Sequence, residues 1–256
     1  MSKRRKFIVS SLILSLGFIF IQFLDVRFRF IAIGLLSLAT LGLSVWSLYE
    51  GLGKNATLLT LVLPAMFTAG VGIFWFLLPV SVFTRIPIII FYGVGIYILC
   101  LTSNIYSVAA IRTIALLRAA RGVGFVLTLV TSFLVFDAIL SLRTIMPVSA
   151  LSVAALSFPL FLQGLWTVSL ETKLPKEIIQ YSLISSLVMG EIAICLHFWP
   201  VTVVVGSLFL TVAIYMLLGL GQAKVEGRLF TQTIREYLLV VGLVFIGMFI
   251  ATHWGV

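Results

Sequence analysis

Long apolar runs alternate with short polar stretches along almost the entire chain. A helix needs about 20 mostly apolar residues to cross a hydrocarbon core roughly 30 Å thick, and these runs have that length. The runs cover residues 7–24, 30–49, 56–78, 87–103, 122–141, 146–170, 178–197, 199–220 and 237–254. They predict an all-α fold, a polytopic bundle of nine transmembrane helices that forms one integral membrane domain over 1–256, with no soluble domain.

Two of the divisions between runs are short. Only Asp25, Arg27 and Arg29 interrupt the apolar sequence between the first and second runs. A single helix over 7–49 would be roughly 64 Å long, twice the thickness of a bilayer, so we expect a break there. At the other short division, we expect Pro200 in the first turn of the eighth helix, where its missing N–H costs nothing.

The composition supports a membrane protein and excludes several other classes. Of the 256 residues, 62% are hydrophobic and 10% are charged, whereas about 25% of a soluble domain is charged. A soluble globular protein, a disordered chain and a disulfide scaffold are therefore excluded. The net charge of +9 does not indicate nucleic-acid binding, because the charges lie between the apolar runs, where they orient helices.

The basic residues also predict the orientation. When nine helices are threaded, all but four of the 17 Lys and Arg residues fall on the side of the N-terminus. The four on the opposite side are Arg27, Arg29, Arg85 and Arg143. Because Lys and Arg accumulate in cytoplasmic loops, we expect a cytoplasmic N-terminus and an external C-terminus.

Two acidic residues lie within predicted spans, where an ionised side chain costs at least about 2.5 kcal/mol. Asp137 is four residues from the end of its run, and we expect it to reach the outer interface beside Arg143. Glu191 lies deeper among apolar helical neighbours, so we expect it to face a partner helix or a pocket. Gln163 has four hydrogen-bonding sites and either lines a polar cavity or joins helices. Glu191, Asp137 and Gln163 are the candidates for an intramembrane proton or substrate site.

Two prolines fall near the middle of predicted spans. Pro64 and Pro159 should each free a backbone carbonyl and kink a helix. Paired interruptions of this kind occur in the inverted repeats of secondary transporters, with a site between the halves. They are also common in ordinary membrane helices.

Segment 105–118 combines helical apolar spacing with basic side chains. It is either an interfacial helix on the cytoplasmic leaflet or an extension of the fourth helix with a basic end. In both cases Arg112, Arg118 and Arg121 should contact anionic lipid headgroups.

The stretch from Ser107 to Ala120, which runs into the fifth span, resembles uncharacterised multi-pass membrane proteins of bacteria. The resemblance covers only part of the chain. It implies a bacterial inner (plasma) membrane and no known activity, and it assigns no site residues.

The sequence favours no particular reaction. It contains no zinc-protease, hydrolase-elbow or phosphate-loop motif, so we predict no catalytic residue, metal or cofactor. The leading hypothesis is a translocator of a small solute or lipid, with or without proton coupling through Glu191. The alternatives are a non-catalytic assembly subunit and a membrane-embedded lipid-modifying enzyme. Expected partners are the bilayer with its anionic lipids and either another membrane protein or a second copy.

Overall fold

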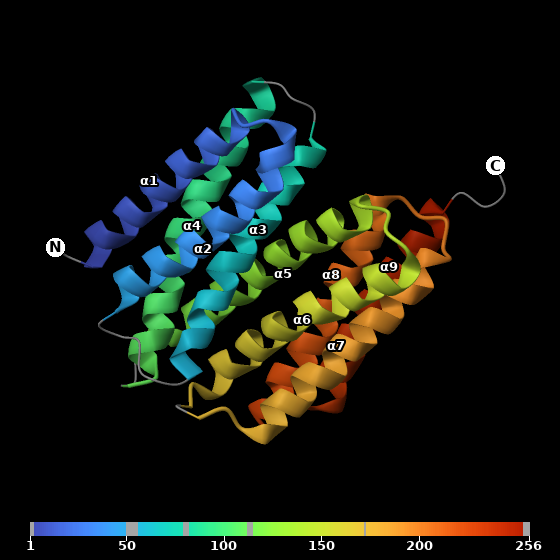
Figure 1. The fold of residues 1–256 in the computed structure, drawn as a ribbon. Helices are drawn as coiled ribbons and strands as arrows, with labels where there is room; N and C mark the ends of the chain where they lie inside the picture. The colour runs from blue at the N-terminus through green and yellow to red at the C-terminus, as the bar shows by residue number, and fades with distance from the viewer. Residues whose placement is uncertain (1–2, 50–55, 79–81, 112–114, 172, 253–256) are drawn as a thin grey trace. The chain divides into compact units, whose positions relative to one another are not determined.

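The computed structural model describes residues 3–49, 56–78, 82–111, 115–171 and 173–252. Within these ranges the regular structure is entirely helical, and nine helices are long and apolar enough to cross a membrane. The elements, shown in Figure 1, are α1 (Lys3–Gln22), α2 (Val26–Leu48), the 3-10 helix η1 (Ala56–Leu61), α3 (Val62–Leu77), α4 (Val82–Ala109), α5 (Leu117–Ser141), α6 (Met146–Ser169), α7 (Lys176–His197), α8 (Val203–Val225) and α9 (Thr231–Ala251). The predicted fold class and the break near Asp25 are confirmed.

Some helices are longer than the apolar runs that predicted them, because polar residues at the ends of those runs are also helical. Helix α4 extends beyond 87–103 in both directions, and α9 begins at Thr231 rather than at 237. The prediction for Pro200 is wrong, because α8 begins at Val203. Thr202 caps that helix instead, and its hydroxyl accepts a hydrogen bond from the Val205 N–H at 3.4 Å.

The two predicted kinks are not equivalent. Pro64 lies in the first turn of α3, directly after η1, so the expected mid-helix kink at this position is wrong. A proline in the first turn removes no helical hydrogen bond. Pro159 lies well inside α6, as expected. The different placements remove the basis for pairing these prolines in an inverted repeat.

The fourth helix extends past its predicted end at 103, as one of the two alternatives for segment 105–118 expects, but the basic end of that alternative is not among the described residues. Helix α4 continues to Ala109, and α5 begins at Leu117, so no separate helix occupies the described part of 105–118. Arg118 and Arg121 lie in the first turns of α5, with Arg118 exposed. Arg112 lies outside the described residues.

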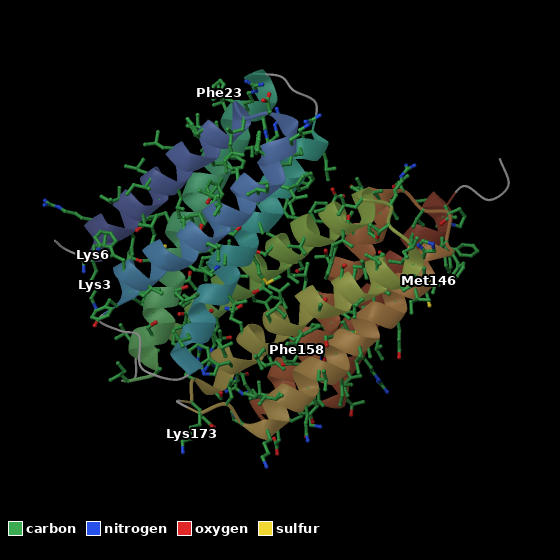
Figure 2. The ribbon with its side chains drawn as sticks, viewed as in Figure 1. Lys3, Lys6, Phe23, Met146, Phe158 and Lys173 are labelled. Atoms are coloured by element: carbon green, nitrogen blue, oxygen red, sulfur yellow. The ribbon has the colours of Figure 1, made fainter. Side chains whose placement is uncertain are left out.

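The chain divides into two compact units, and α5 contributes to both. Unit 1 comprises residues 1–131 and 170–173, and contains α1 to α4 and the first part of α5. Within unit 1, α1 contacts α2 and α4, and α2 contacts α3. Figure 2 shows Lys3 and Lys6 at one end of α1 and Phe23 just beyond the other.

Hydroxyl groups join the helices of unit 1. The Ser11 hydroxyl donates to the Gly93 carbonyl at 2.6 Å, which ties α1 to α4. The hydroxyls of Thr40 and Thr68 are 3.0 Å apart, and that of Tyr92 lies 3.2 Å from Thr68, so one buried chain links α2, α3 and α4. Interhelical hydrogen bonds of this kind stabilise membrane bundles.

Unit 2 comprises residues 132–169 and 174–256, and contains the rest of α5 with α6 to α9. Helices α6 and α7 lie side by side in Figure 1 and form its most extensive contact. A Cβ on Gly190 of α7 would lie 3.3 Å from the Ala150 carbonyl of α6, so the two backbones approach closely there. Small residues at such contacts let membrane helices pack tightly. Figure 2 shows Met146 at the beginning of α6 and Phe158 partway along it.

Candidate functional site

A cavity lies at the end of unit 2 where two helical connections meet. Helix α5 ends at Ser141 and α6 begins at Met146, while α7 ends at His197 and α8 begins at Val203. We call this the pocket end of unit 2. The cavity has a volume of about 410 Å³. Its polar lining consists of Arg143, Thr144, Ser149, His197, Trp199 and Thr202.

Arg143 follows directly after α5 in an unusual backbone conformation. Its φ is +45°, in the left-handed region, and its N–H donates to the Leu140 carbonyl at 3.2 Å to close the helix. A non-glycine residue in this region costs on the order of 1 kcal/mol. Its side chain is exposed and lines the cavity, and no carboxylate among the described residues forms an ion pair with it. The guanidinium is therefore available to a ligand.

The opposite wall is formed where α7 ends. His197 is the last residue of α7, and its exposed imidazole lines the cavity. The Trp199 indole N–H donates to the Thr252 hydroxyl at 2.8 Å, next to the end of α9. This hydrogen bond holds one wall of the cavity in place.

Asp137 lies one helical turn deeper than the cavity lining. Leu140 and Gly206 line the cavity; Asp137 precedes Leu140 by three residues, and Ser207 follows Gly206. The Ser207 hydroxyl lies 3.3 Å from Asp137 Oδ1. The Asp137 side chain is 4% exposed, so the expectation that it reaches the interface beside Arg143 is wrong. Its neighbour is a hydroxyl on α8.

The Ser207 hydroxyl has two acceptors within reach but only one hydrogen. Besides Asp137, it lies 3.0 Å from the Val204 carbonyl oxygen. When Asp137 is ionised, the hydroxyl can donate to the carboxylate. When Asp137 is protonated, it can donate to Ser207 while Ser207 donates to Val204. The same geometry therefore satisfies both protonation states of Asp137.

Glu191 does not line this cavity. Its side chain is exposed on α7, and the expectation that it faces a neighbouring helix or a pocket is not met within unit 2. The buried face of α7 instead carries the small residues Ser182, Ser186 and Gly190. That stripe is visible in the sequence, and Glu191 lies about 100° around the helix from Gly190.

Gln163 is buried, but far from Asp137. It is 3% exposed, and its Oε1 has no hydrogen-bond partner within the described part of the chain. The next residue, Gly164, accepts a hydrogen bond from Gln222 Nε2 at 2.9 Å. Because Gln222 lies about 22 Å along α8 from Ser207, Gln163 and Asp137 are at opposite ends of unit 2.

Sequence reasoning did not identify the cavity. The predicted threading puts Arg143 and the end of the 178–197 run on the same side of the membrane, but 54 positions separate Arg143 from His197. Only the packing of α5 to α8 brings the two connections together. The polar residues in the short connections on the side opposite the N-terminus were the one sequence feature that could have indicated this cavity.

No functionally curated protein and no solved structure matches the chain. One family model, described as "Protein of unknown function (DUF5656)", matches residues 12–251. The expected membership of an uncharacterised family is therefore confirmed. Since the match spans nearly all of this multi-pass membrane chain, the chain belongs to the DUF5656 family of proteins of unknown function.

Proposed function

We propose that this protein is a membrane translocator of a small solute or lipid, and that unit 2 carries its substrate site. The cavity at the pocket end admits the substrate, and Asp137 carries a coupling proton. The observation that carries this proposal is the position of the buried Asp137–Ser207 pair, one helical turn from a polar cavity. An acid inside a membrane span is typical of proton and ion pathways.

Asp137 takes the role that the sequence suggested for Glu191. It is buried, and its hydrogen bonding allows it both to hold and to release a proton. No ion pair to Asp137 exists in the described ranges, so no fixed cation holds it permanently ionised. Glu191 is exposed on α7 and has no comparable setting.

The cavity favours this function over the two alternatives. An assembly subunit would satisfy its polar groups in tight packing, whereas Arg143 and His197 are exposed at a cavity. A lipid-modifying enzyme would gather acids and bases at one depth, whereas the residues that line this cavity include no acid. These features support substrate binding followed by movement.

The proposed setting is the bacterial inner membrane, with the pocket end on the external side. Arg118 and Arg121, at the start of α5, would then lie at the cytoplasmic face and contact anionic lipid there. This arrangement follows from the distribution of Lys and Arg.

The test uses the full chain reconstituted in liposomes, with two probes. Uptake of radiolabelled inorganic phosphate reports a soluble substrate, and dithionite-monitored movement of fluorescent phosphatidylglycerol reports a lipid. We expect at least one of these processes to be faster than in protein-free liposomes and to depend on pH. In Asp137→Asn the rate should fall about tenfold or lose its pH dependence, because the amide cannot titrate.

Glu191→Gln is the matched control, since it removes one carboxyl group from the exposed side of α7. It should retain the rate and the pH dependence of the wild type. The proposal is contradicted if neither probe moves faster than in empty liposomes, or if folded Asp137→Asn behaves like Glu191→Gln.

A further inference from the structure

We infer that the cavity at the pocket end of unit 2 binds an oxyanion, such as the phosphate of a lipid headgroup or a free anion. Its use in transport rests on the proposed function, but the binding itself does not. The inference comes from the kinds of polar groups around the cavity and from the absence of an acid among the residues that line it.

Hydrogen-bond donors surround the cavity on several sides, where they could bind an anion. Arg143 contributes a guanidinium from the connection after α5, and His197 contributes an imidazole from the end of α7. Thr144, Ser149 and Thr202 add hydroxyl groups. The nearest acid along these elements is Asp137, which lies a turn deeper, beyond the lining residue Leu140. An anion in the cavity would therefore meet donors without a competing carboxylate.

The helix ends around the cavity add to this preference. Helices α6 and α8 begin at the pocket end, and the N-terminus of a helix carries partial positive charge. Helices α5 and α7 end there and contribute partial negative charge, which the Arg143 cation directly after α5 offsets in part. Two helix N-termini thus remain to attract an anion.

The rest of the lining is apolar and suits an amphiphile. Ile139, Leu196 and Val201 lie among the polar groups, and the indole of Trp199 borders them. A lipid could place its phosphate against Arg143 and the beginning of its acyl chains against this apolar side. A free oxyanion would use the donors alone.

Binding is measured on the full chain purified in a neutral detergent. Isothermal titration with inorganic phosphate tests the free oxyanion, and native mass spectrometry with phosphatidylglycerol or phosphatidylcholine tests the headgroup. The variants are Arg143→Asn, which removes the charge while tolerating a left-handed backbone, and His197→Gln. The control is Arg228→Asn, which removes an exposed cation beyond the opposite end of α8.

We expect wild-type protein to bind inorganic phosphate or to retain phosphatidylglycerol in preference to phosphatidylcholine. Arg143→Asn should weaken that binding about tenfold, because a charge-assisted hydrogen bond is lost. His197→Gln should weaken it less, and Arg228→Asn should leave it unchanged. Phosphate binding identifies a free oxyanion as the ligand, and retention of phosphatidylglycerol alone identifies a headgroup.

The inference is overturned if the wild type binds neither probe, or if Arg228→Asn weakens binding as much as Arg143→Asn. Thermal unfolding of each variant separates lost binding from lost folding. Intact binding with no transport of either probe would leave this inference standing and contradict the proposed function alone.

Discussion

The two cysteines have very different surroundings. Cys100 in α4 is 1% exposed within the core of unit 1. Cys195 in α7 is exposed, one helical turn beyond Glu191 on the same side of the helix. Both thiols are free. Their reactivities therefore report the packing of the two units separately.

We predict that a membrane-permeable maleimide labels Cys195 quickly and Cys100 slowly in the folded protein. The reagent can reach an exposed thiol, whereas Cys100 requires local opening of unit 1. Mass spectrometry of the labelled chain gives the rate at each position, and Cys195→Ser should show almost no early labelling. Equal rates in the folded state would contradict the packing of α4, and both thiols should react in denaturant.

The directions of Asp137 and Glu191 show how far the sequence could predict the site. The positions of Asp137 and Glu191 within the apolar runs were enough to predict that both acids lie inside membrane spans. They could not tell which side of its helix each acid occupies, because membrane helices are apolar toward lipid and toward one another. The small residues of α7 contained that information, since Gly190 and Ser186 mark its buried face. The setting of Asp137 depends on Ser207, a residue 70 positions away, and no local pattern indicates that contact.

At the scale of elements, α9 is the least buried of the nine spans of the described chain. It packs against α8 and against the connection before α8, with contacts at both of its ends. At one end the Tyr237 ring lies directly on the backbone of Gly219 in α8. At the other end of α9, the Trp199 indole N–H donates a hydrogen bond to the Thr252 hydroxyl. The Trp199 ring also packs edge-on against the rings of Phe245 and Phe249. Because Trp199 also lines the cavity, the position of α9 affects the cavity wall.

We predict that Gly219→Ala destabilises unit 2, since a Cβ at this position would overlap the Tyr237 ring. Such overpacking costs about 1–3 kcal/mol in the free energy of unfolding. Gly242→Ala in α9 is the matched control, because no atom lies within 4 Å of its Cβ position. Alanine also favours the helix more than glycine does, so the control should be neutral or slightly stabilising. Unfolding in a detergent titration measures both variants, and equal stabilities would refute the contact.

The helices themselves were predictable because length and hydropathy define a membrane span. The ends of the helices were not predictable in the same way. Charged residues marked the ends of the apolar runs, but a helix can continue through such residues. Arg235 and Glu236, for example, lie within the first turns of α9. Pro64 shows the same limitation. It would kink a helix that began well before it, but α3 begins at Val62, so Pro64 lies in the first turn.

At the scale of the whole molecule, nine crossings of the membrane would put the two ends of the chain on opposite sides of it. The nine candidate spans of the described chain do not give the direction in which the chain is inserted. The direction depends on charge, since Lys and Arg are retained on the cytoplasmic side during insertion. It determines whether the cavity at the pocket end opens outward or inward.

We predict a cytoplasmic N-terminus and an external C-terminus. Reporter fusions after Lys54, Gly122 and Gln222 should read cytoplasmic, and fusions after Arg29, Arg143 and Val256 should read external. Every connection predicted to be cytoplasmic carries Lys or Arg, which is the bias that retains a loop inside. An external reading after Gln222 would contradict the nine-span topology. A cytoplasmic reading after Arg143 would place the cavity on the inner face, where it would accept substrate from the cytoplasm.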